Sequence, residues 1–497
     1  KGYAFCKWQA SPHARAFATL GNEKGARFAL DHGEKGDPRR SVGYCLKCHA
    51  TGFQPKIAGG GAEDTFSLLE GVGCESCHGP GSAHAEAALA SKDKETILAT
   101  LVRPAQQTCI DCHQKKEFAL DTALRAIAHP AVPPPVDKVV RYKTPLNPVL
   151  RPGGQELYVT CEAAASVCVL DTATNRKVAE IGVGGQPVDI AFSPDGRRAY
   201  VTNRLDDSLS VVDADARKVI ATVPVGDEPH GVRTDRAGET IYVLNTSSDD
   251  ISVLDAKTLR EEKRLAASRS PWALALSPDG SRFFVTNALS RFVPFRTPSV
   301  SEVTVIDAQR KIIDDRPTVP AANLLQGVAW HPSGEFAVMT LLRTKNLVPM
   351  TRMVQGWTVT NGLGIVWADG RVDQVLLDEP GECFPDPTAV AITPDGALAL
   401  VTSAGNNRVA IVDLKKLRSL LESASPEDRA EVIPNHYGMA SQFVRAQVPT
   451  GINPRGITIS PDGRTAYVAC APEDSVQVLD IAAGKITATI DLEGPKE

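Results

Sequence analysis

Residues 193–213, Ser-Pro-Asp-Gly-Arg-Arg-Ala-Tyr-Val-Thr-Asn-Arg-Leu-Asp-Asp-Ser-Leu-Ser-Val-Val-Asp, hold the pattern that decides the fold of most of this chain. A tight turn is followed by an apolar strand and by a second strand that ends in Asp. A third strand follows, and a fourth precedes the next turn. Four strands in each period of about 40–45 residues are typical of a β-propeller blade. Turns of this type recur seven times, ending at Gly154, Gly196, Gly238, Gly280, Gly334, Gly396 and Gly463.

The regular spacing of these turns favours a propeller over other all-β folds. The first four turns are 42 residues apart. A two-layer sandwich also has many short strands, but nothing in it requires a fixed period. We therefore predict an all-β, seven-bladed β-propeller over residues 143–497. This part resembles the YVTN family of seven-bladed propellers, through Tyr200-Val201-Thr202-Asn203 and Tyr158-Val159-Thr160-Cys161. The resemblance implies the fold and says little about function, because propellers host many unrelated activities.

Three of the seven predicted blades carry insertions, since the later turn spacings are 54, 62 and 67 residues. Two insertions fall between the second and third strands, around residues 288–301 and 341–361, and one between the last two strands of blade six, around 414–447. The first two are rich in aromatic and basic side chains, among them Phe292, Arg343 and Trp357. Loops of that composition are typical of interfaces. The alternative is that these insertions have no function and are tolerated because surface loops vary freely in length and sequence. We expect the first two loops to share a face with the chain that enters blade one.

The N-terminal part, residues 1–135, contains Cys-x-x-Cys-His three times within 69 residues. This spacing attaches c-type haem: the two thiols bind the haem covalently and the adjacent histidine ligates the iron. Zinc is the alternative for Cys₂His clusters, but each site would need a fourth ligand. We therefore predict three haem c groups. The attaching thiols are Cys45, Cys48, Cys74, Cys77, Cys109 and Cys112, and the iron ligands His49, His78 and His113.

The N-terminal part resembles the multihaem cytochrome c554 family. The resemblance rests on Ser11-Pro12-His13-Ala14, on Cys77-His78-Gly79-Pro80-Gly81-Ser82-Ala83-His84 and on Ile127-Ala128-His129-Pro130. It implies a small, mainly helical or irregular cytochrome domain, with His13, His84 and His129 as the second axial ligands. His32 lies outside the family pattern. The family usually has four haems, but Cys6 stands alone where the first motif would lie, which leaves the pairing of ligands and haems open. The Pro-rich segment 129–142 is interpreted as a linker.

Composition restricts the location and the partners of this protein. The chain has 497 residues and a net charge of −5, which gives no reason to expect nucleic acid or an anionic membrane surface as partner. No apolar run approaches the ~18 residues of a membrane helix.

Haem attachment to Cys-x-x-Cys-His takes place outside the cytoplasm, so we interpret the chain as a mature periplasmic or extracellular protein whose export signal has been removed. In such a compartment Cys161 could pair with Cys168 or with Cys470, and the sequence leaves both pairings open.

The leading functional hypothesis is an electron-transfer protein rather than an enzyme. Four spare histidines, those at 13, 32, 84 and 129, suffice to give three haems two axial histidines each. The expected partners are redox proteins or an extracellular electron acceptor, with the propeller as docking or assembly scaffold. A narrower version has subunits stacking into a haem-wire filament. The alternative is a haem oxidoreductase that acts on a small inorganic nitrogen or sulfur compound at an open haem or at the propeller mouth.

Overall fold

The computed structural model describes Arg27 and residues 53–54, 61–62, 142–294, 297–344 and 359–494. Contacts divide the chain into two compact units, Lys1–Val139 and Val140–Glu497. In the first unit a small sheet pairs β1 (Phe53–Gln54) with β2 (Gly61–Ala62). All the predicted haem-binding cysteines and histidines lie outside the described residues. The proposed domain limits, 1–135 and 143–497, stay predictions.

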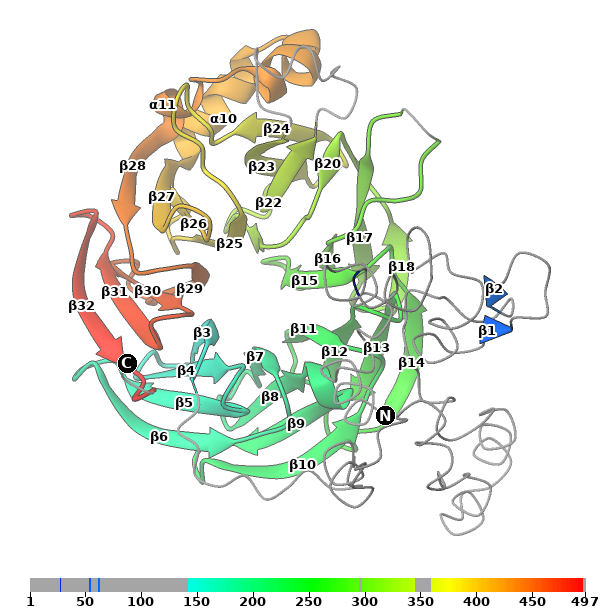
Figure 1. The fold of residues 1–497 in the computed structure, drawn as a ribbon, viewed down its shortest axis with the longest axis vertical. Helices are drawn as coiled ribbons and strands as arrows, with labels where there is room; N and C mark the ends of the chain where they lie inside the picture. Colours follow the sequence, from blue (N-terminus) through cyan, green and yellow to red (C-terminus); the bar gives the residue numbers. More distant parts are fainter. Residues whose placement is uncertain are drawn as a thin grey trace. The chain divides into compact units, whose positions relative to one another are not determined.

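The second unit is a seven-bladed β-propeller, as predicted (Figure 1). Each blade is an antiparallel sheet built from one uninterrupted stretch of chain. Blade 1 consists of β3 (Pro145–Leu150), β4 (Glu156–Cys161), β5 (Ser166–Asp171) and β6 (Arg176–Gly182). Blade 2 consists of β7 (Pro187–Phe192), β8 (Arg198–Asn203), β9 (Ser208–Asp213) and β10 (Lys218–Pro224), with the short helix η4 (Arg204–Asp206).

Blades 3 to 5 continue the ring. Blade 3 consists of β11 (Pro229–Thr234), β12 (Thr240–Asn245), β13 (Asp250–Asp255) and β14 (Glu261–Ala266). Blade 4 consists of β15 (Pro271–Leu276), β16 (Arg282–Asn287), β17 (Val300–Asp307), β18 (Ile312–Asp315) and β19 (Thr318–Pro320). Blade 5 consists of β20 (Ala322–Asn323), β21 (Val328–Trp330), β22 (Phe336–Thr344), β23 (Val359–Trp367) and β24 (Val372–Leu376).

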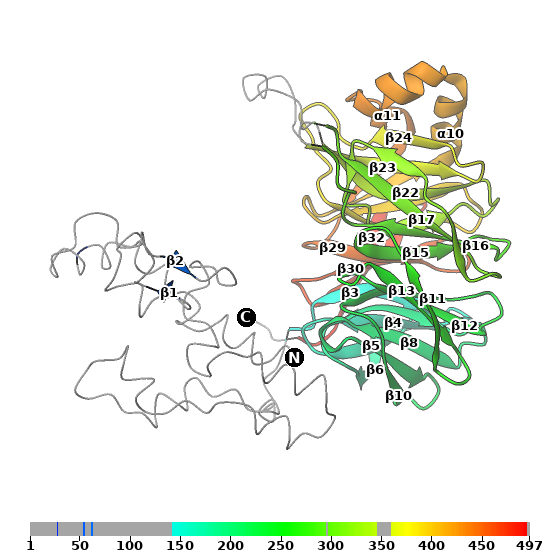
Figure 2. The ribbon, with the colours of Figure 1, turned by 90° about the vertical axis from the view of Figure 1, so that its right-hand side faces the viewer.

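Blades 6 and 7 complete the ring, and the third insertion is helical. Blade 6 consists of β25 (Pro387–Ile392), β26 (Leu398–Ser403), β27 (Arg408–Asp413) and β28 (Val444–Pro449). Between β27 and β28 lie α10 (Leu414–Ser423), η6 (Asp428–Val432), η7 (Ile433–Asn435) and α11 (Ala440–Phe443), at the rim beside blade 5 (Figures 1 and 2). Blade 7 consists of β29 (Pro454–Ile459), β30 (Thr465–Cys470), β31 (Ser475–Asp480) and β32 (Lys485–Asp491).

The repeated turn forms the same structure in all seven blades, between the first and second strands. Its glycine has a positive φ of 69° to 77° in every copy, a conformation that costs glycine little because it has no Cβ. In blade 2 the Ser193 hydroxyl donates to Asp195 Oδ1 (2.6 Å) and accepts from Arg198 N (3.0 Å). The hydrogen bonds from the Ser193 hydroxyl and from the Arg197 amide lower the pKa of the Asp195 carboxyl, the one from Ser193 contributing most. The bonds that form the turn are thus local, and in all seven copies the glycine amide also donates to the carbonyl three residues earlier.

The apolar core is divided into seven clusters, each between two neighbouring blades. One of these clusters joins blade 7 to blade 1, with Leu157 and Val476 among its buried side chains. The innermost strands also approach closely, because a Cβ at Gly456 would lie 2.4 Å from the Leu146 carbonyl oxygen. No strand of the described propeller is shared between the two ends of the ring. Closure therefore depends on side-chain packing and on hydrogen bonds between the two ends of the propeller. Among these bonds, the amides of Lys143 and Thr144 both donate to Asp474 Oδ1 (2.7 and 2.8 Å), and Lys177 Nζ donates to Leu492 O (3.1 Å).

The threonine of the Tyr-Val-Thr-Asn strand joins neighbouring blades. Thr202 Oγ1 accepts from Asp189 N in its own blade (3.0 Å) and donates to the His230 carbonyl oxygen of the next (2.6 Å). The hydroxyls of Thr160, Thr286 and Thr402 donate in the same way to the next blade, to the carbonyls of Val188, Gln326 and Arg455. These threonines are fully buried, so each hydroxyl satisfies backbone groups that water does not reach.

The inserted loops only partly follow the expectation of an interface. Both second-to-third-strand insertions lie between the predicted strands, β16–β17 and β22–β23. Phe292 is 85% exposed, with the Arg269 guanidinium 4.0 Å above its ring. Arg343, in contrast, is buried, and its Nη1 donates to Pro320 O (3.2 Å) and Gln374 Oε1 (3.0 Å). The prediction that Arg343 belongs to an interface is therefore wrong, because these buried acceptors already use its guanidinium.

Candidate functional site

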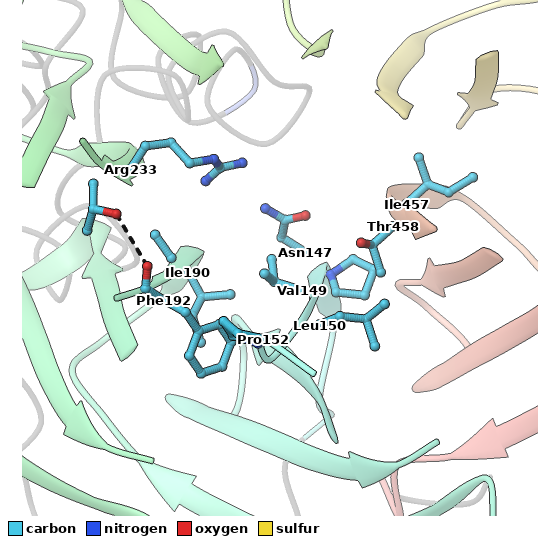
Figure 3. A pocket seen from close by; sticks show the side chains of 12 residues that line it. Asn147, Val149, Leu150, Pro152, Ile190, Phe192, Arg233, Ile457 and Thr458 are labelled. Carbon is cyan, nitrogen blue, oxygen red and sulfur yellow. Dashed lines mark hydrogen bonds between the residues drawn. The ribbon is translucent and has the colours of Figure 1, made fainter. Parts of the chain in front are cut away.

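The candidate site is a pocket of about 280 Å³ in the central channel of the propeller (Figure 3). The innermost strands β29, β3, β7 and β11 line it. Most of the lining is apolar, and the polar residues are Asn147, Arg233, Thr234 and Thr458. Concave sites with an apolar wall and a few converging polar groups are the usual binding sites for small molecules.

Asp189 on β7 anchors the polar side of this pocket, and its side chain is 7% exposed. Its Oδ1 accepts from Asn147 Nδ2 and from the Ile190 amide (2.8 Å). Its Oδ2 accepts from the Val232 amide (3.0 Å) and from Arg233 Nη1 (2.7 Å). A buried carboxylate needs this degree of pairing to remain charged. Asp189 thereby holds blades 1, 2 and 3 in register around the channel and fixes the Arg233 guanidinium.

His230 lies on β11, three residues before Arg233, and bonds to the next blade. Its Nδ1 is 2.8 Å from the carbonyl oxygen of Trp272, and its ring packs against the Trp272 ring, with centroids 3.7 Å apart and an angle of 32° between the ring planes. In blades 1, 2, 4 and 6 a threonine hydroxyl donates to the corresponding carbonyl of the next blade, but in blade 3 Leu244 occupies the threonine position. The His230 ring replaces the missing hydroxyl. Burial lowers the pKa of His230 to about 4, so the ring is neutral at pH 7.

The three histidines of the propeller lie in different blades. His230 is on the innermost strand β11. His331 lies in a turn, with Nδ1 2.7 Å from Ser333 Oγ and Nε2 3.1 Å from the Gly396 carbonyl oxygen. His436 follows η7 at the rim. Among the residues described, no cluster of His, Cys, Asp and Glu is arranged to hold a metal ion.

The structure distinguishes between the two cysteine pairings that the sequence left open. Cys161 Sγ lies 3.5 Å from Cys168 Sγ, and both side chains are in the cluster between blades 7 and 1. Cys470 belongs to the cluster between blades 6 and 7. The cysteine that neighbours Cys161 is therefore Cys168.

The sequence analysis missed Asp189 and Arg233, although the repeat contained a signal. At the Asp189 position the other blades have Asn147, Gly231, Ala273, Gly327, Ala389 and Gly456. At the Arg233 position they have Val149, Ala191, Ala275, Ala329, Ala391 and Thr458. Most blades have a small residue at these two positions, which lie on the innermost strand. A charged residue at either position was therefore the signal that could have indicated the site.

The chain combines a cytochrome c554-like N-terminal region with a seven-bladed β-propeller, and two family models match it in this order. The model for cytochrome c554 and c-prime matches residues 3–79, and that for the cytochrome D1 heme domain matches residues 153–339. The first match supports haem c as cofactor. No helix in the described part of the chain is long and apolar enough to cross a membrane.

The individual proteins that this chain resembles come from two organisms. The propeller superposes on a chain of Kuenenia stuttgartiensis hydrazine synthase with a TM-score of 0.64 and 26% identity, over 68% of this chain and 96% of that one. Hydrazine synthase subunit beta of the same organism is 28% identical over 43% of this chain and 54% of its own length. Cytochrome c-554 of Nitrosomonas europaea is 36% identical over 15% of this chain and 32% of its own length. The chain thus spans about half the length of hydrazine synthase subunit beta and about a third of the length of cytochrome c-554.

The described residues of the propeller do not fit the haem that the D1 family name implies. A haem in the channel would need an axial ligand beside a cavity that admits its ring. No histidine lines the described pocket, and both ring nitrogens of His331 have partners within the propeller. The D1 match is therefore evidence for the propeller fold.

Proposed function

We propose that this protein is a haem oxidoreductase that acts on a small inorganic nitrogen compound. The observation that carries the proposal is the likeness of the propeller to hydrazine synthase, which extends over 96% of that solved chain. The likeness of the N-terminal region to cytochrome c-554 adds a source of haem c. These comparisons favour the enzyme over the electron carrier, which was the leading hypothesis from sequence.

In this proposal the two parts of the chain have different tasks. The six thiols of the Cys-x-x-Cys-His motifs attach three haems, and His49, His78 and His113 ligate their irons. A c-type haem supplies one-electron transfer, or a substrate site where an axial position is open. The propeller channel supplies the polar groups that bind a small molecule. Attachment of haem c also implies export to the periplasm or beyond.

The electron carrier is the second candidate, because the spare histidines suffice for complete axial ligation. It would have His13, His84 and His129 as second ligands of the three haems, and a redox protein or an extracellular acceptor as partner. Stacking of subunits into a filament is the more specific form of this candidate.

Absorption and EPR spectra of the full-length, haem-loaded protein distinguish the two candidates. The enzyme should contain a high-spin haem whose spectrum changes on addition of hydroxylamine or nitrite, and it should consume that compound when reduced dye is supplied. Spectra that are entirely low-spin and insensitive to these compounds would support the carrier. His32→Ala is the matched control for His84→Ala, because only the latter removes a proposed axial ligand and should create a new high-spin signal.

A further inference from the structure

The guanidinium of Arg233 is only partly used by its contacts within the propeller. Nη1 makes both of its hydrogen bonds, to Asp189 Oδ2 (2.7 Å) and to the Val232 carbonyl oxygen (2.6 Å). Nε and Nη2 have no partner among the described residues. The side chain is 37% exposed, and Figure 3 shows its head group directed into the channel pocket. The Nε and Nη2 donors, on one edge of the Arg233 guanidinium, therefore face the pocket.

Two further polar groups of the pocket are free to bind a ligand. Asn147 uses its amide nitrogen for Asp189, which leaves Oδ1 without a partner among the described residues. The Thr458 hydroxyl likewise forms no hydrogen bond within the part of the chain described. Both residues line the same pocket as Arg233, on β3 and β29 (Figure 3). Side chains from three blades thus converge on one small volume.

The charge of the pocket favours a small anion. Each carboxylate oxygen of Asp189 accepts two hydrogen bonds, and two of the four donors are backbone amides. The carboxylate therefore has no lone pair left for a further donor. Arg233 is the only cation that lines the described pocket. The Nε and Nη2 edge of a guanidinium presents two parallel donors that match the two oxygens of a planar oxyanion. One cation, already paired with one carboxylate, suits a monoanion better than a dianion such as sulfate.

We propose that the channel pocket is a binding site for a small planar oxyanion, held by Arg233 and oriented by Thr458. The inference rests on the proposed function for the choice of ligand: nitrite and nitrate are the planar monoanions of inorganic nitrogen, and the two oxygens of nitrite match the two free donors of the guanidinium. Nitrate, formate and bicarbonate share the same chemistry and are the competing ligands. Asp189 is a positioning residue, since it fixes the guanidinium and does not touch the anion.

Calorimetric titration of the full-length, haem-loaded protein with sodium nitrite tests the site, with haem absorption recorded in parallel. Binding in the channel should release heat without changing the haem spectrum. Arg233→Gln should weaken this binding phase at least 10-fold and leave any spectral response to nitrite unchanged. Arg236→Gln is the matched control: this arginine lies in the turn of the same blade, where Nη1 donates to Pro278 O (2.9 Å), and it does not line the pocket.

Thr458→Val provides a second test that leaves the Asp189–Arg233 pair intact. Thr458→Val should weaken nitrite binding several-fold. If Arg233→Gln does not fold, this variant alone tests whether the pocket binds the anion. Nitrite binding that is equal in the wild type, Arg233→Gln and Thr458→Val would overturn the proposal. Tighter binding of nitrate, formate or bicarbonate than of nitrite would overturn the assignment of the ligand. If the channel binds nitrite while no nitrogen compound is turned over, the proposed function fails and the anion site stands.

Discussion

Replacing Thr202 by valine tests the interpretation of the threonine contacts between blades. The substitution conserves shape and removes one hydroxyl. It leaves the Asp189 amide and the His230 carbonyl oxygen without their present partner. A buried polar group that loses its partner costs about 1–3 kcal/mol, so two of them should lower the free energy of unfolding by roughly 3 kcal/mol. At about 2.1 cal/mol/K per residue over roughly 360 residues, this corresponds to a fall in Tm of about 4 °C.

Differential scanning calorimetry of the haem-loaded protein measures this fall. Thr222→Val is the matched control, because Thr222 is exposed on the outer strand β10 of the same blade. Its Tm should stay within about 1 °C of the wild type, since exposed substitutions change stability by only about 0.5 kcal/mol. Equal Tm values for the two variants would refute the reasoning that the threonine hydroxyls hold neighbouring blades together.

Three further predictions concern the cysteines, the buried histidine and the haem content. Protein prepared without reductant should yield a linked peptide pair containing Cys161 and Cys168 in mass spectrometry, and a Cys161–Cys470 pair would contradict the structure. Because burial lowers the pKa of His230 from 6.5 to about 4, the unfolded state binds its proton first on acidification. The free energy of unfolding in urea should therefore fall by roughly 2 kcal/mol between pH 7 and pH 4, with allowance for partial exposure, and less so in His230→Gln. Pyridine haemochrome analysis should give three haems per chain, falling to two in a Cys74→Ala, Cys77→Ala double variant. A ratio unchanged by that variant would exclude the second motif as an attachment site.

The number of blades and the order of their strands could be predicted because the period is set by local chemistry. The turn glycines adopt a positive φ, and the backbone hydrogen bond that closes each turn is local, so seven copies of the turn indicate seven blades. The three insertions also fall between the predicted strands. The bonds between blades could not be predicted, since they join residues 28 to 53 positions apart along the chain. The role of Thr202, for example, depends on a carbonyl 28 residues later.

The channel site was missed because a repeat hides residues that differ in only one copy. Asp189 and Arg233 are 44 residues apart and come together only when blades 2 and 3 pack side by side. His230 illustrates the same difficulty. Its ring is explained by the absence of a hydroxyl at Leu244, and this compensation is visible only in three dimensions. The haem ligands, in contrast, follow from a local motif and stay predictions.

The way in which the ring closes makes the blades exchangeable units. Since every sheet is one continuous stretch of chain, a circular permutation that links residue 494 to residue 143 and opens the chain between blades 3 and 4 would break no strand pair. The permuted propeller would keep all seven sheets, and its new termini would lie between β14 and β15, in the two blades that the His230–Trp272 contact joins. In propellers whose first sheet contains strands from both ends of the chain, the same operation would divide a sheet. The free energy of unfolding of this propeller should therefore approach a sum of one contribution per blade and one per interface between neighbouring blades, as in linear repeat proteins.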